Sequence, residues 1–306
     1  MSDIVSFSFT VISNLIVFLF FSTLLDNVEE FKPTIPVLSK FFLCLNQAVL
    51  NLQDLEKTNP AIIKGELFDY EICFDENEKG YDIVRCLVVC IFVACIFNNY
   101  ELAVKLAKIG RPLINHISSF FMEPIFLFYD GLVSLASVRT FEQGEEKKTR
   151  IQHAKEIITR LKKMSEDAPE NYANKVHLLE AELAVINNET SKAVSNFESA
   201  IELSVKHNFP NEEALIRERA AMYYMKVDSM QQATQLLLQS FYCFKRWGAV
   251  AKVKEMNSKY PTLLKEKSYT SNAIGTLAIN MNVENHSTTS ISLLSETPSH
   301  KKKLKL

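Results

Sequence analysis

Apolar residues recur along most of the chain with the period of an α-helix, and short polar breaks separate the apolar stretches. The stretch 151–164 places four apolar side chains on one face of a helix: Ile151, Ala154, Ile158 and Leu161. Residues 85–97 are too apolar for an exposed helix and too short to cross a membrane, so they predict a core helix. The pattern therefore predicts an all-α protein.

The second half of the chain contains an internal repeat. The first copy consists of Ala181, Ala193, Phe197 and Ala200. Forty residues later, Ala221, Ala233 and Leu237 repeat the spacing of its first three members. Small residues at these offsets let two antiparallel helices approach closely, and the larger residue fills the gap between them. Tetratricopeptide-like (TPR-like) pairs show the same offsets with a period of about 34 residues, so these units are long. We therefore predict antiparallel helix pairs stacked as a TPR-like superhelix, an α-solenoid.

Composition narrows the class of protein further. Seven glycines and nine prolines in 306 residues favour helices joined by short connections. The net charge of −2 provides no general attraction for nucleic acid, so we expect no nucleic-acid partner. The cysteines of "RCLVVCIFVACIF" lack the C-x-x-C spacing of a zinc site and are expected to be buried thiols in a reducing compartment.

The segment Ile4–Leu25 carries no charged residue and is long enough to span a bilayer. It holds seven Ser, Thr or Asn residues, no Lys or Arg precedes it, and no basic cluster follows it. Two interpretations stay open. The expected one is a helix buried in a cytoplasmic protein, and the alternative is a membrane-anchored, membrane-associated protein.

Three regions follow from these patterns. Residues 1–40 hold the apolar N-terminal helix and a proline break, and residues 41–264 form the helical repeat domain. Residues 265–306 are rich in Ser, Thr and Asn, end in "HKKKLKL", and are expected to be disordered.

The stretch 240–264 contains the single tryptophan, Trp247, followed by Gly248. Trp247 continues an apolar stripe along the preceding helix, and a glycine at the next position is typical of a helix C-terminus. Pro261 disfavours the α-conformation of Tyr260 and stops the next helix. Because the basic residues lie off the apolar stripes, these four residues predict a structural cap on the last repeat, not a nucleic-acid site.

Several stretches together resemble one region of very large signalling proteins. They are "FLFYDGLVSLAS", "APENYANKVHLLEAELAVI", "NFESAIELSVKHNFPNEEALIRERAAMYYM" and "CFKRWGAVAKVKEMNSKYPTLL". That family combines a kinase-like domain, an AAA-type ATPase, a helical repeat region, a GAF domain and a sensor histidine kinase. The similarity covers about residues 41–264 and implies the helical connector between ATPase and GAF domain. Asn174-Lys175 stands where the family has His-Lys, and Arg219 follows the matching Glu218.

The catalytic motifs of that family are absent from this sequence. It contains no G-x-x-x-x-G-K-[ST] loop and no H-R-D and D-F-G pair, so we expect neither ATPase nor kinase activity, no cofactor and no metal. The function predicted is a non-catalytic scaffold or protein-interaction module related to two-component signalling. Its partner would be a protein, such as a full-length multidomain ATPase and sensor kinase.

The first helices of each pair are the predicted interaction face. Five polar residues on them are expected to be exposed and available to a partner: Asn174, Lys175, Glu182, Arg217 and Arg219. The alternative is that each is an ordinary solvated surface residue.

Overall fold

The computed structural model describes residues 36–54, 56, 59–73, 81–116, 122–138 and 144–265. These ranges are mostly helical, and no strand occurs in them apart from one isolated antiparallel bridge between Lys64 and Asp69. The chain divides into two compact units, Met1–Lys259 and Tyr260–Leu306, which are described separately. The segment Ile4–Leu25 and the tail from residue 266 lie outside the described residues.

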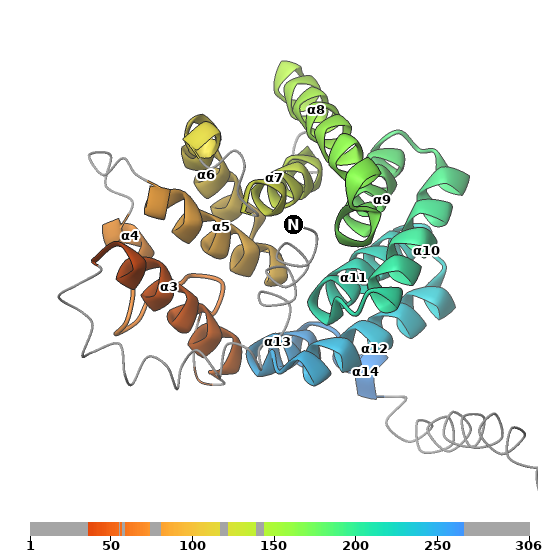
Figure 1. Cartoon of the computed structure of the whole chain (residues 1–306). Helices are drawn as coiled ribbons and strands as arrows, with labels where there is room; N and C mark the ends of the chain where they lie inside the picture. Colours follow the sequence, from red (N-terminus) through yellow and green to blue (C-terminus); the bar gives the residue numbers. More distant parts are fainter. Residues whose placement is uncertain are drawn as a thin grey trace, which may run out of the picture. The chain divides into compact units, whose positions relative to one another are not determined.

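The α-helices of the first unit are labelled in Figure 1, and one 3-10 helix lies among them in the chain. They are α3 (Pro36–Gln53), α4 (Tyr70–Cys73), α5 (Tyr81–Ile96), α6 (Tyr100–Gly110), the 3-10 helix η2 (Arg111–His116), α7 (Met122–Val138), α8 (Glu145–Asp167), α9 (Pro169–Ile186), α10 (Thr190–Lys206), α11 (Pro210–Lys226), α12 (Met230–Trp247) and α13 (Val250–Lys259). The second unit contributes α14 (Pro261–Lys265). Among the described helices, none is both long and apolar enough to cross a membrane.

The same turn joins helices at four places in the first unit. Four non-glycine residues have a positive φ of 55–60°: Asn98, Asn188, Asn208 and Asp228. In each turn the next residue donates its backbone N–H to a carbonyl five positions earlier, at 2.8–2.9 Å. This is the Schellman arrangement, and Asn and Asp tolerate its left-handed residue better than most side chains. The turn connects α5 to α6, α9 to α10, α10 to α11, and α11 to α12, so each of these helices folds back on the one before it.

The repeated small residues lie where the helices meet. Each of the repeat positions predicted from sequence is buried: Ala181, Ala193, Phe197, Ala200, Ala221, Ala233 and Leu237. Helix α7 is buried along its whole length. A Cβ atom at Gly131 would lie 3.0 Å from Leu179 on α9 and 3.1 Å from Ile157 on α8, so this glycine permits the close approach of three helices.

The end of the helical array meets its beginning. Within the first unit, α5 contacts α3 and α7, α7 contacts α9, and α13 contacts α3 (Figure 1). Among the described helices, the end of the array therefore has a neighbour, because α3 from the N-terminal part of the chain contacts α13.

The described cysteines agree with the expectation of buried thiols. Five of them are free and buried: Cys44, Cys86, Cys90, Cys95 and Cys243. Cys44 of α3 lies against α5, where its Sγ is 3.8 Å from the carbonyl oxygen of Cys86. Burial raises the pKa of the Cys44 thiol well above its ordinary value, so the unreactive protonated form dominates.

Candidate interaction site

The predicted interaction face is not at the surface. Asn174, Lys175, Glu182 and Arg219 are each no more than 2% exposed, and Arg217 is partly buried. The expectation that these residues are exposed is therefore wrong for the first four. They are buried because partners on neighbouring helices neutralise their charges or accept their hydrogen bonds, and those partners lie far along the chain.

Lys175 on α9 forms a buried ion pair with Glu212 on α11. Its Nζ lies 2.7 Å from Glu212 Oε2 and donates a second hydrogen bond, 2.9 Å long, to the carbonyl oxygen of Asn171. The Asn174 amide donates to the same carboxylate oxygen. Burial lowers the pKa of Lys175, while the Glu212 carboxylate opposes that shift and stabilises the charged amine.

About two helical turns further along, Arg219 of α11 pairs with Glu182 of α9. Arg219 Nε donates to Glu182 Oε1 at 2.6 Å, and its Nη1 donates to the hydroxyl of Tyr100 at 2.6 Å. The guanidinium carbon also lies 5.2 Å from the centroid of the Tyr100 ring. Burial opposes the charged form, but the Glu182 carboxylate prevails and raises the pKa of Arg219, so the guanidinium stays charged.

The residue beside Arg219 extends this network to α13. Glu218 Oε1 accepts hydrogen bonds from Lys252 Nζ and from the Asn98 amide, both at 2.9 Å. Lys252 Nζ also lies 2.7 Å from Glu255 Oε2. Four elements thus meet through charged or polar side chains: α9, α11, α13 and the α5–α6 turn.

A second ionic cluster lies on α7. Asp130 accepts hydrogen bonds from Arg111, with Nη2–Oδ1 and Nε–Oδ2 distances of 2.8 and 3.1 Å, and His153 Nε2 lies 2.8 Å from its Oδ2. Burial alone would raise the pKa of Asp130, but His153 and Arg111 overcome it and hold the pKa below its ordinary value. The carboxylate therefore joins η2, α7 and α8.

Arg217 differs from the other four predicted residues. Its Nε donates to Glu213 Oε1 at 2.9 Å, and its Nη1 donates to Gln239 Oε1 of α12 at 2.6 Å. Its side chain keeps 14% of its surface exposed. Arg217 therefore remains within reach of solvent, although its hydrogen bonds lie within the protein.

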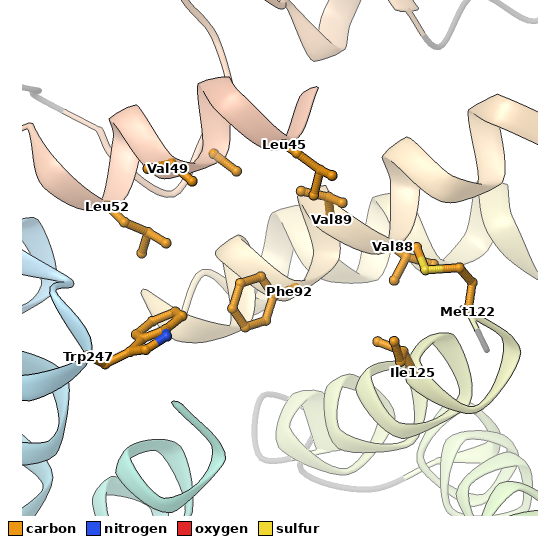
Figure 2. A pocket seen from close by; sticks show the side chains of 10 residues that line it. Leu45, Val49, Leu52, Val88, Val89, Phe92, Met122, Ile125 and Trp247 are labelled. Carbon is orange, nitrogen blue, oxygen red and sulfur yellow. The ribbon is translucent and has the colours of Figure 1, made fainter. Parts of the chain in front are cut away.

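Trp247 lies against the N-terminal helices. Its ring is 5% exposed, and its centroid is 5.9 Å from that of Phe92 on α5 in an edge-to-face arrangement. Figure 2 shows a cavity of about 30 Å³ beside it, lined only by apolar side chains from α3, α5, α7 and α12. The prediction that Trp247 is buried is confirmed, but its partner is α5 as well as its own repeat.

The other members of the predicted cap divide between the two units. Gly248 adopts φ 90° and ends α12 in the left-handed conformation, as the sequence predicted. Tyr260 and Pro261 belong to the second unit, where the Tyr260 carbonyl oxygen accepts a hydrogen bond from the Leu264 N–H at 3.1 Å. The sequence predicted that Tyr260 and Pro261 form a cap together with Trp247, and this stays a prediction.

Sequence reasoning missed several residues of these clusters, among them Asp130, Glu212, Glu218 and Lys252. A signal was present for Asp130 and Lys252, which stand in the family-like stretches between uncharged, mostly apolar neighbours. A charged residue inside an otherwise buried helix requires a partner. Among the described residues, no group of three or more His, Cys, Asp or Glu side chains is arranged to hold a metal ion.

Comparisons with known proteins give one relative. The hybrid signal transduction histidine kinase G of Dictyostelium discoideum is 30% identical to this chain over 114 residues. The aligned part is 37% of this chain and 3% of the kinase. No family profile and no solved structure matches the chain. Part of this helical chain is therefore similar to a small part of a signalling protein.

Proposed function

We propose that the chain is a non-catalytic scaffold, a TPR-like protein-interaction module that acts in signal transduction. The observation that carries the proposal is the repeated helix–turn–helix unit, in which one left-handed turn recurs four times. Ion pairs between α9, α11 and α13 add a second regularity, because their members are 34–37 residues apart. Stacked helical repeats present extended surfaces and typically bind other proteins.

The outer helices supply the surface for this role. The ion pairs that join α9, α11 and α13 are buried in the protein, so we propose that a partner contacts α8, α10 or α12. On α12, Met230 and Tyr242 are 43% and 44% exposed. Tyrosine and methionine are enriched in protein interfaces, so we propose that the exposed side of α12 contributes to the binding surface.

The proposed partner is a multidomain sensor kinase similar to the Dictyostelium relative. The partial sequence match and the family-like stretches support this context. Because the sequence lacks the phosphate-binding and kinase motifs, we propose that the chain itself turns over no ATP.

Reciprocal co-precipitation tests the proposal. The tagged chain and tagged histidine kinase G would be expressed together in Dictyostelium, and we expect each to recover the other. The double variant Met230→Asp/Tyr242→Asp should lower recovery several-fold. Leu50→Asp is the matched control, because Leu50 is 47% exposed and belongs to another helix, α3.

Circular dichroism of the three proteins must show equal helicity for the comparison to hold. Recovery equal to that of beads without the chain would reject the kinase as partner. An equal loss of recovery in the α12 double variant and in Leu50→Asp would reject α12 as the binding surface.

A further inference from the structure

The α5–α6 turn reaches across the first unit to α11. Asn98 donates to Glu218, and Tyr100 accepts from Arg219, although about 120 residues separate the two segments. Both contacts end on adjacent residues of a single helix. The two hydrogen bonds therefore join the N-terminal helices to the repeat that follows the middle of the chain.

We propose that these two contacts form a latch whose release opens the first unit. The latch residues are Asn98 and Tyr100 on one side and Glu218 and Arg219 on the other. When it opens, α3, α5 and α6 move away from α11–α13, and each helix pair stays folded. The Glu182–Arg219 and Glu218–Lys252 ion pairs form a charged row that is buried in the closed form, and this row then becomes accessible to a partner.

The closed latch leaves two buried charged atoms without a partner. Among the described residues, Glu218 Oε2 and Arg219 Nη2 have no hydrogen-bond acceptor or donor within reach. A buried, ionised group with an unsatisfied atom opposes the state that buries it. Opening admits water to both atoms, so this cost of closure is relieved in the open form.

The interactions gained on closure and the hydration gained on opening are of comparable kind, so the first unit can exist in two states. Closure gains two charge-assisted hydrogen bonds, the Phe92–Trp247 ring contact and the packing of α3 against α13. Opening gains hydration of Glu218 and Arg219. A partner that binds the charged row binds only the open form and shifts the population toward it. This inference does not depend on the outer-surface interaction proposed above.

Trp247 provides a built-in reporter of the latch. It is the single tryptophan in the sequence, and it packs against Phe92 only four residues before α5 ends at Ile96. Moving α5 away would expose the indole to water. The emission of the chain would then shift to longer wavelength without any added label.

The double variant Asn98→Gly/Tyr100→Phe removes both latch contacts, and with them the hydrogen bond that the Tyr100 hydroxyl donates to Asn98 Oδ1. Glycine adopts the φ of 55° at position 98 readily, and phenylalanine keeps the ring that lies beside Arg219. The matched control is Asn188→Gly/Tyr224→Phe. Asn188 has a φ of 60° in the equivalent α9–α10 turn, and neither control residue takes part in the two latch hydrogen bonds.

The experiment measures tryptophan emission, acrylamide quenching and far-ultraviolet circular dichroism on the full chain. We expect the latch variant to show red-shifted emission and several-fold stronger quenching, with the helical signal retained. The control should match the wild type in all three. Unchanged emission and quenching in the latch variant would overturn the proposal.

Hydrogen exchange separates a latch from general destabilisation. Release of a latch predicts faster amide exchange in α3, α5 and α13 of the double variant, with α9 and α10 unchanged. Loss of the helical signal, or faster exchange spread evenly through α9 and α10, would overturn the proposal and make the two contacts ordinary supports of the fold.

Discussion

Glu182 on α9 and Arg219 on α11 form a fully buried ion pair with an O–N distance of 2.6 Å. The two residues are 37 positions apart in the chain, and neither reaches solvent. A buried pair of this kind replaces hydration by direct hydrogen bonds, so the pair contributes little net stability while each member depends on the other. Substitution of one member therefore has a different outcome from substitution of an exposed charge.

Arg219→Ala should lower the free energy of unfolding by about 3–5 kcal/mol, because it leaves the Glu182 carboxylate buried without its cation. Arg217→Ala on the same helix should cost less than about 1 kcal/mol, because Arg217 is partly hydrated and its ion pair is local. Urea denaturation followed by circular dichroism measures both values. Equal effects of the two substitutions would contradict the burial of Arg219.

Trp247→Ala should cost about 3–5 kcal/mol, since it deletes a buried aromatic side chain. Tyr242→Ala, five residues earlier on the same helix, removes a side chain that is 44% exposed and should change stability by less than about 0.5 kcal/mol. Thermal melts of the two variants measure these changes in stability. A Trp247→Ala protein that melts together with Tyr242→Ala would show that the indole is not packed against α5.

Gly248→Ala should cost about 1–2 kcal/mol, because a Cβ atom disfavours the left-handed backbone at φ 90°. Gly248→Asn should cost less, because asparagine already occupies three of the four left-handed turns described above. Chemical denaturation of both variants provides the test. Equal stability of wild type and Gly248→Ala would mean that α12 ends in another conformation in solution.

Asp130→Asn should destabilise the protein near neutral pH and have a smaller effect in acid. The pKa of Asp130 is lower in the folded chain than its ordinary value of about 3.9, so the folded state favours the carboxylate. Its contribution is therefore fully present above about pH 4, and it falls as pH decreases through the lowered pKa of the folded state.

The measurement is the difference in unfolding free energy between wild type and Asp130→Asn from pH 7 down to pH 2. We expect the difference to shrink below about pH 4. Asp228→Asn is the control, because Asp228 is exposed in a turn that accepts asparagine. A difference that stays constant with pH would mean that Asp130 is not ionised in the folded protein.

The local features of this fold could be read from the sequence. Helix periodicity, the polar breaks at 187–191, 207–212 and 226–230, and the glycine after Trp247 each depend on neighbours within a few residues. The structure places helix ends at or beside these positions. The repeat of small residues also predicted buried positions correctly, because small side chains at fixed offsets let two helices pack closely.

The amphipathic pattern failed where a helix is buried on more than one side. On α11, residues 210–216 are all buried, including Glu212 and Glu213, so no polar face remains to mark the solvent side. The sequence pattern predicts that polar residues in such a helix are exposed. Only the positions of their partners in the structure show that they are buried.

The sequence by itself determined that this chain forms short helices, that they are joined by tight turns, and that Ala181, Ala221 and Trp247 are buried. These properties follow from local backbone preferences and from hydrophobic periodicity. Only the tertiary structure decided that Lys175, Arg219 and Glu218 are internal and that α13 meets α3. The physical reason is that pairing between distant charges and contact between distant helices depend on which surfaces meet after the helices have formed, and the residues adjacent to each charge do not show which partner it will meet.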